Sequence, residues 1–575
     1  MKIKQLISLS LLATVCCTSC LDLDYNEVTT NDENWVYESP IYGVQKLVTN
    51  VYAHVQNEFD TNYSGAIKAS TTDEADYASS LSDIHKFYNG GWSPINPFST
   101  IWKNAYSAIA EANIFLEKYE KISLEDYLYN ASGDTDYELL KSKFEMFPYE
   151  VRYLRAYFYF ELAKAYGNVP LVTKSLTNTE ANNVQQTPVN DVFKYICDEC
   201  DQIAEFLPIT YKNELSQDIG RASRPMALAL KARTQLYAAS PLFNPSGDKG
   251  LWKKAAESNK LVIDKCTEWG ISLDKYSSLW GTENFFNKEM IMIMGTTDAK
   301  DKDGRAERND FEKFNYPVGV ENGNSGNCPT QNLVDAYEYK ETGKTFGETW
   351  GNTINLNVDK PYDGLDPRFA MTIIKHGDAW PSYNTFPIEI THGGLNAPPL
   401  YGATPTGYYL KKYCDGSVNI STNNANYKRH SWILFRLGEF YLNYAEAVYQ
   451  YSGNADDKSE FGMSANEALN VLRDRVDVQM PHITGSANWE TRYIRERMVE
   501  LAFEDHRFWD IRRWKKGNEY FTNIKTMRLD KKEDGTVIMT RGSKTRQWND
   551  KYYLFPIPFT EIQKNPKLKQ NPGWE

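Results

Sequence analysis

Residues 497–514 constrain the fold more than any other stretch of this 575-residue chain. The stretch contains no Pro and no Gly, and its residue types predict one continuous helix. At about 100° per residue its apolar side chains form no single stripe, because Phe503 and Trp514 point away from the face shared by Met498, Leu501 and Phe508. A helix that is apolar on most sides is usually buried, so we expect this segment in the core.

The same segment is rich in charge. Glu500, Glu504 and Arg507 fall on one edge at i, i+3/i+4 spacing, and Asp505 and Arg512 project close together. Buried charges need partners, so we expect an internal ion-pair network. The functional alternative is an acid/base site built from Glu504, Asp505 and His506, although no nucleophile or metal-ligand set lies near them.

Residues 500–514 resemble the C-terminal signature helix of the SusD/RagB family, which comprises outer-membrane lipoproteins that bind nutrients, mostly glycans, for a TonB-dependent transporter. The family usually has Gly where this chain has Asp505. The tail from Tyr553 to Trp574 resembles the family's ending, and Arg155-Ala156 followed by Tyr166-Gly167-x-Val169-Pro170 is similar to it as well. The resemblance implies a mainly α fold of tetratricopeptide-like helical hairpins, and a binding protein rather than an enzyme.

The N-terminus has the features of a targeting segment, which we place at residues 1–19. The apolar run from Leu6 to Val15 is too short to span a bilayer. Cys17-Thr18-Ser19-Cys20 resembles a bacterial lipobox with Cys20 as the lipidated first residue; a plain secretory signal is the alternative. We therefore expect a protein anchored to the outer membrane through lipid only, facing the cell exterior of a Gram-negative bacterium.

Helical spacing of apolar residues organises most of the rest of the chain. It predicts helices over residues 99–116, 149–166, 189–207, 223–240, 251–266, 431–451, 464–476 and 489–514. Helices that alternate with loops of varying length suggest stacked hairpins, although only the resemblance supplies the repeat class. We expect an N-terminal helical region at 20–240 and a C-terminal region at 270–575.

From about residue 283 to 429 the chain is rich in Gly, Asn, Pro and Tyr, and turn residues break up any period. A long irregular stretch within a compact protein is more often a binding surface than a packing element. We therefore expect a loop-rich insertion that carries the ligand site.

Sugars offer C–H faces that stack on aromatic rings and hydroxyl groups that need hydrogen bonds. Two regions place aromatic rings among Gly and Asn. One is the turn with Tyr88, Asn89 and Trp92, where Gly90 and Gly91 leave little to cover the Trp ring. The other is the insertion, and its candidate rings are Tyr316, Trp350, Trp380 and Tyr383. The alternative for each ring is packing under its own loop.

Several classes of function lack support in the sequence. The net charge of −12 and the absence of a basic block argue against nucleic acid as a partner. Zinc-protease, hydrolase-elbow and phosphate-loop motifs are missing. The segment Asp301 to Gly304 resembles a calcium loop but fails the EF-hand pattern, so we expect no metal and no cofactor.

The sequence therefore predicts a surface lipoprotein that captures an oligo- or polysaccharide and passes it to a TonB-dependent transporter barrel of the SusC/RagA kind. Three alternatives remain open: a peptide-binding lipoprotein of the RagB kind, a helical-repeat scaffold without a small ligand, and a glycoside hydrolase.

Overall fold

The computed structural model describes residues 40–56, 63–97, 99–122, 125, 134–211, 220–281, 284–295, 310–428 and 430–575. Cys20, the predicted leader and the Asp301–Gly304 segment lie outside the described residues. Across the described ranges, no helix is both long and apolar enough to cross a membrane. The chain divides into two compact units, residues 1–47 with 118–144, and residues 48–117 with 145–575.

In the first unit the ring of Tyr119 packs on that of Phe144, with centroids 4.8 Å apart. Three helices contain residues of both units: α3 (Pro40–Tyr52), α4 (Ile101–Tyr119) and α6 (Asp134–Tyr166).

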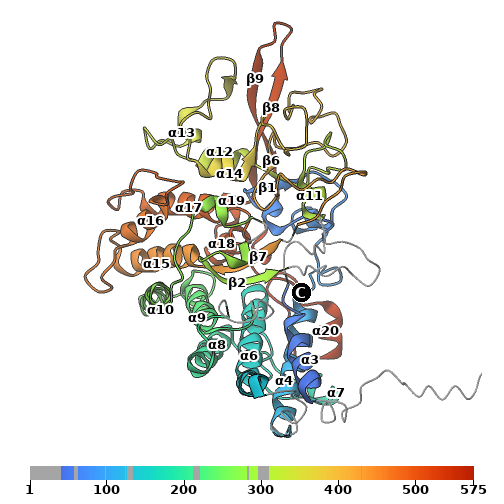
Figure 1. Ribbon diagram of the computed structural model, residues 1–575, viewed down its shortest axis with the longest axis vertical. Helices are drawn as coiled ribbons and strands as arrows, with labels where there is room; N and C mark the ends of the chain where they lie inside the picture. Colours follow the sequence, from blue (N-terminus) through green and yellow to red (C-terminus); the bar gives the residue numbers. More distant parts are fainter. Residues whose placement is uncertain are drawn as a thin grey trace, which may run out of the picture. The chain divides into compact units, whose positions relative to one another are not determined.

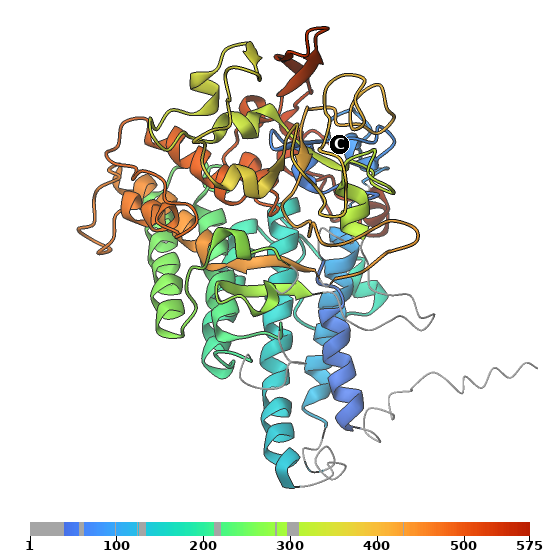
Figure 2. The ribbon, with the colours of Figure 1, turned by 45° about the horizontal axis from the view of Figure 1, so that its top comes forward.

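The second unit is mainly helical, as predicted. Figures 1 and 2 show α8, α9 and α10 side by side, and α10 packs in turn on α15. The longer helices of this unit are α4 (Ile101–Tyr119), α8 (Val189–Ile203), α9 (Arg224–Ala239), α10 (Lys249–Glu268), α15 (Leu437–Ser452), α16 (Ala465–Arg473) and α17 (Trp489–Glu500). Its short helices are α7 (Asn178–Ala181), α11 (Asp310–Asn315), α12 (Gln331–Ala336), α13 (Phe346–Thr349), α14 (Arg368–Thr372), α18 (Arg507–Arg513), α19 (Gly517–Tyr520) and α20 (Phe559–Lys564).

Residues at the helix ends explain why the helices start and stop where they do. Ser464 caps α16, where its side chain accepts from the backbone N–H of Glu467 in a capping box. Gly167 follows α6 with φ +69° and Gly453 follows α15 with φ +75°, a left-handed conformation that costs Gly little.

All strands pair antiparallel in small sheets, with the orders β1–β3, β2–β7, β4–β9–β8 and β5–β6. Their bounds are β1 (Ala75–Tyr77), β2 (Met290–Gly295), β3 (Asn327–Pro329), β4 (Thr353–Asn355), β5 (Ile373–Ile374), β6 (Tyr409–Leu410), β7 (Ser431–Arg436), β8 (Asn523–Lys531) and β9 (Val537–Thr545). The predicted helix over 431–451 is therefore wrong at its start. The apolar run from Trp432 to Phe435 forms β7 and pairs with β2, which joins the two ends of the loop-rich insertion.

The predicted helix over 489–514 is also interrupted. It ends as α17 at Glu500 and resumes as α18 at Arg507, and between them Phe503 and Asp505 both have φ +62°. A left-handed backbone is incompatible with a continuing α-helix. Gly adopts a left-handed backbone at little cost, which fits the Gly that the family resemblance implies at the position of Asp505. We call residues 501–506 the signature turn.

An N-terminal segment, residues 70–76, is buried against the C-terminal part of the chain. Asp73 accepts two hydrogen bonds from Arg507, at 2.8 and 2.7 Å. Arg546 donates to the backbone carbonyls of Ser70 and Thr72 and, at 2.8 Å, to the carboxylate of Asp76. These contacts join residues more than four hundred positions apart in the sequence.

Candidate functional site

Three of the predicted aromatic residues meet in the loop-rich insertion. The ring centroid of Tyr316 lies 6.2 Å from that of Trp380 and 6.5 Å from that of Tyr383. Trp380 and Tyr383 are half-buried, whereas Tyr316 is 0% exposed. We call these three residues and the loops around them, 317–325, 376–390 and 415–428, the loop platform.

Tyr316 is buried and holds one of the platform loops through hydrogen bonds to its backbone. Its hydroxyl donates to the backbone carbonyls of Asp415, at 2.6 Å, and Val418, at 3.0 Å. The prediction that Tyr316 contacts ligand directly is wrong for this structure, because a ring without exposed surface has nothing to offer a sugar. Its role is to fix the loop that follows Cys414.

The indole ring of Trp380 packs against the backbone at Gly416. A Cβ added at Gly416 would lie 2.5 Å from the indole, so only Gly leaves room for the ring. The neighbouring residue Ser382 donates from both its backbone N–H and its hydroxyl to the carbonyl of Gly416, at 2.8 and 2.7 Å. The ammonium of Lys411 lies 5.2 Å from the indole centroid, within cation–π range, and burial lowers its pKa. The ring is therefore held in place before any ligand arrives.

Tyr383 and its neighbours bring amide groups beside the rings. The backbone N–H of Ile420 donates to the Tyr383 hydroxyl at 3.4 Å, and Asn322 donates to the Ile420 carbonyl at 2.8 Å. Asn384 donates to the carbonyls of Trp380 and Phe386, at 3.1 and 2.8 Å. Such bonds hold the loops while the side-chain oxygens keep acceptor capacity.

Two exposed rings belong to the same loops and were not predicted. Phe386 is 64% exposed and Tyr427 is 42% exposed. Phe386 follows Asn384 and Thr385, and Tyr427 follows Asn426. The criterion that selected Trp380, an aromatic ring among Gly, Asn and Pro in the insertion, would therefore have selected these rings as well. Exposed aromatic rings offer the flat faces on which sugars stack.

An ion pair beneath the platform ties it to α11. The Nε2 of His430 lies 2.8 Å from Glu312, whose carboxylate also accepts from the backbone N–H of Asp415 at 3.0 Å. Burial lowers the pKa of His430, but the Glu312 carboxylate raises it more, so the net shift is upward. Lys428 pairs with Asp415 at 3.0 Å on the outer side.

Trp92 lies elsewhere, and the prediction that it is exposed is wrong. Its ring is 2% exposed and packs on Phe87, Phe555 and Trp574, with centroids 4.7, 4.8 and 5.2 Å away. Gly90 is exposed and Gly91 is half-buried, but these glycines do not leave the Trp92 ring open as expected. The C-terminal tail, which is distant in sequence, covers the ring instead.

Tyr88 and Asn89 also stand apart from the platform. The guanidinium of Arg546 lies 4.3 Å from the centroid of the half-buried Tyr88 ring, and the Tyr88 hydroxyl donates to Asp76 at 3.4 Å. Asn89 is exposed, and its side chain accepts from the backbone N–H of Gly91 at 2.9 Å. These residues shape the turn that precedes Trp92.

Trp350 belongs to a further cluster, beside β4 and β9. Its indole N–H donates to the Tyr339 hydroxyl at 2.6 Å, and its carbonyl accepts from Arg541 at 3.4 Å. The ring is half-buried and 6.5 Å from that of Phe346. Of the seven predicted glycan-contacting residues, the structure thus brings together Tyr316, Trp380 and Tyr383 only.

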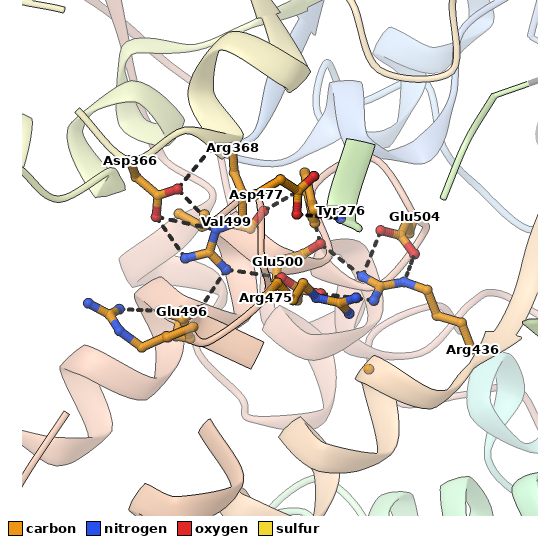
Figure 3. A network of polar contacts seen from close by, with 12 residues as sticks. Tyr276, Asp366, Arg368, Arg436, Arg475, Asp477, Glu496, Val499, Glu500 and Glu504 are labelled. Carbon is orange, nitrogen blue, oxygen red and sulfur yellow. Dashed lines mark hydrogen bonds and ion pairs between the residues drawn. The ribbon is translucent and has the colours of Figure 1, made fainter. Parts of the chain in front are cut away.

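The predicted ion-pair network is confirmed, and it includes Glu500, just before the signature turn, and Glu504 within it (Figure 3). Glu500 accepts from Arg436, Arg368 and Arg475, at 2.9, 3.0 and 3.1 Å. Burial raises the pKa of Glu500, but the three guanidinium groups lower it more, to well below its usual range. We call Glu289, Arg368, Arg436, Lys412, Arg475, Glu496, Glu500 and Glu504 the signature-turn network.

This network leaves no free acid or base at Glu504. The carboxylate accepts from Lys412 at 2.7 Å and from Arg436 at 2.6 and 3.0 Å, and its side chain is 1% exposed. Burial and nearby cations hold the pKa of His506 well below its usual value. A general acid needs access to substrate and a proton to give, so these contacts support the structural interpretation. Among the described residues no group of three or more His, Cys, Asp or Glu side chains is placed to hold a metal ion.

Two family models and several known proteins resemble this chain in sequence. The sequence pattern of the SusD family matches residues 288–574, and that of a family described as starch-binding and associating with the outer membrane matches residues 24–236. SusD-like protein P2 of Formosa agariphila is 23% identical over 494 residues, which cover 83% of this chain and 80% of that protein.

Solved structures have the same fold. A SusD-like protein from Bacteroides fragilis superposes with a TM-score of 0.74 at 26% identity, covering 94% of this chain and 98% of that one. A laminarin-binding SusD-like protein superposes with a TM-score of 0.64 at 23% identity, covering 93% of this chain and 100% of that one. The helical hairpins, the signature turn and the two matched halves lead to one conclusion: this chain belongs to the SusD/RagB family.

Proposed function

We propose that this protein is a cell-surface lipoprotein that binds an oligo- or polysaccharide on the loop platform and delivers it to a TonB-dependent outer-membrane transporter. The observation that carries the proposal is the half-buried pair Trp380 and Tyr383, which is held by backbone contacts in loops that also carry the exposed rings of Phe386 and Tyr427. The name of the laminarin-binding relative and the family description support a glycan as the ligand.

The platform binds by stacking and hydrogen bonding, without covalent chemistry. Sugar C–H groups stack on the indole and phenol faces, and hydroxyl groups bond to the amide oxygens of residues such as Asn322 and Asn384. Because the rings are fixed beforehand, little conformational entropy is lost on binding. Rapid release, which delivery to a transporter needs, follows from contacts that are individually weak.

Attachment to the outer membrane is assigned to lipid on Cys20. Each buried CH₂ of an acyl chain contributes roughly 0.8 kcal/mol, and two or more chains give stable anchoring. In fractionated cells, Cys20→Ala should move the protein out of the outer membrane. Unchanged co-fractionation of that variant would exclude the anchor.

The ligand is tested with the purified mature chain and a panel of soluble glycans that includes laminarin and starch, together with mixed peptides. Affinity electrophoresis selects the ligand, calorimetry gives its Kd, and chromatography of the sugar detects cleavage. Trp380→Ala combined with Tyr383→Ala should weaken glycan binding by about 1–3 kcal/mol. Trp350→Ala, a half-buried Trp outside the platform, is the matched control and should bind normally. Peptide binding alone, sugar cleavage, or equal affinity of the double variant would each overturn the proposal.

A further inference from the structure

A groove among the helices shares no lining residue with the loop platform. A groove of about 510 Å³ runs between α4, the segment 170–184 and α20. We call it the α4 groove. Its volume falls within the range of roughly 300–1,000 Å³ that is usual for ligand pockets.

One stripe of α4 forms the floor of the groove. Lys103, Ser107, Ala110 and Ile114 follow one another at i, i+4, i+7 and i+11, which places them on a single helix face. The two middle residues are small, so the face is hollow between the Lys and the Ile. Ile114 is 42% exposed, which is unusual for an aliphatic residue of a helix whose other face is buried.

The walls are held rigidly by buried amides. Asn113, which is 1% exposed, donates to the carbonyls of Val172 and Lys174, at 3.2 and 3.1 Å. On the other side Asn565 donates to the carbonyls of Ala181 and Val184, at 3.3 and 2.8 Å. The groove is therefore formed before any occupant binds.

Its lining is aliphatic and its rim is basic. Leu176 and Val184 are half-buried in the walls, and Lys103, Lys174 and Lys564 are exposed around them. Lys174 pairs with Glu180 at 3.7 Å, and Lys564 pairs at 2.9 Å with Glu561, which also lines the groove; such solvent-accessible pairs are weak. Three lysines therefore face one carboxylate in the lining. A concentration of lysines is distinctive in a chain with net charge −12.

The lining does not suit a sugar. The Trp102 ring is 6% exposed, and the Tyr106 hydroxyl is already engaged by the carbonyl of Pro170 at 2.9 Å. Aliphatic surface between cations suits alternating aliphatic and acidic side chains instead, on a segment narrow enough to lie along a helix. We propose that the α4 groove binds an extended peptide segment of a partner protein in which Leu or Ile alternates with Asp or Glu.

The test uses the full mature chain and a fluorescent heptapeptide, Glu-Leu-Asp-Ile-Glu-Leu-Asp, with anisotropy as the readout. Two other peptides are compared: one with Lys in place of each acid, and one with Ser in place of each aliphatic residue. The acidic–aliphatic peptide should bind at least about tenfold more tightly than either. Higher salt should weaken its binding, because exposed charges contribute.

Variants locate the binding. Ile114→Asp and Lys103→Glu should each weaken it about tenfold or more. Leu261→Asp on α10 is the matched control, since Leu261 is 40% exposed and outside the groove, and it should bind like wild type. Trp380→Ala should also bind the peptide normally, which separates this site from the glycan platform. Absence of binding, equal binding of all three peptides, or a full response from Ile114→Asp would overturn the proposal.

Discussion

The signature-turn network and the loop platform use polar groups in opposite ways. In the network, carboxylates such as Glu500 and Glu289 are fully buried, and each accepts from two or more guanidinium groups. In the platform, polar groups hold backbone, while the faces of Trp380 and Tyr383 stay partly open. A saturated network has no capacity left for a ligand, so the dense charge of the network has a structural role, whereas the partly exposed aromatic rings form the binding site that we propose.

The largest loss of stability is expected from a substitution of Glu500, at the centre of the signature-turn network. Glu500→Gln keeps the side-chain shape but removes the one negative charge that pairs with all three guanidinium groups, each of which keeps another carboxylate partner. The change should lower the free energy of unfolding by about 3–5 kcal/mol, because it leaves excess buried positive charge. Urea denaturation measures this loss. Glu268→Gln removes an exposed pair with Lys265 and should cost less than about 1 kcal/mol. A small effect at Glu500, or a loss of glycan affinity by the folded variant, would contradict the structural role of the network.

Substitution of Trp92 tests whether a buried aromatic ring contributes to stability, in contrast to the partly exposed rings of the loop platform. Trp92→Ala removes a ring packed on all sides and should destabilise the protein by about 3–5 kcal/mol, with unchanged glycan affinity at a temperature where the variant is folded. Thermal denaturation and calorimetry measure the two quantities. Lower affinity with unchanged stability would instead return Trp92 to the binding site.

A smaller effect is expected from a substitution of Gly416, on which the Trp380 ring packs. Gly416→Ala places a methyl group 2.5 Å from the indole, so the ring must move. Glycan binding should weaken by about 1 kcal/mol while most of the stability is kept, because the loop can adjust. Titration calorimetry of Gly416→Ala against wild type measures the difference. Unchanged affinity would show that the seated position of the ring is not the one that binds.

The smallest expected effect depends on pH. His430 has a folded-state pKa above its ordinary value of 6.5, because the imidazolium pairs with Glu312. A raised pKa contributes stability that is fully present below the ordinary value and is lost as pH rises through the folded value. The stability difference between wild type and His430→Gln should therefore shrink as pH rises above 6.5. A difference that is constant with pH would show that the pair does not stabilise the loop.

Much of the helical scaffold could be predicted from sequence, since caps and stops are local. The capping residues Ser464 and Glu467 mark the start of α16, and Gly167 marks the end of α6. The burial of the signature segment and its internal ion pairs were also predicted correctly. Both follow from the mixture of apolar and charged residues on all sides of one helical stretch.

Three features depended on distant contacts that local patterns do not record. The left-handed turn at Phe503 and Asp505 replaces a helix that propensity favours, because the turn aims Glu500 and Glu504 at arginines from other segments. Ser431–Arg436 is a strand because β2 lies beside it. Trp92 is covered by a tail more than four hundred residues away, which no reading of its own turn could reveal.

The bonds from Arg507 and Arg546 to residues 70–76 also bear on how the chain is assembled. Asp73 and its partner are 434 positions apart, and Asp76 and its partner 470, so closing these loops carries a large entropic cost that local structure cannot reduce. Asp73 and Asp76 cannot make these ion pairs until residues 507 and 546 have been synthesised. The burial of residues 70–76 thus depends on residues that lie more than four hundred positions later in the chain, and a chain truncated before Arg507 should remain incompletely folded around Asp73 and open to proteases.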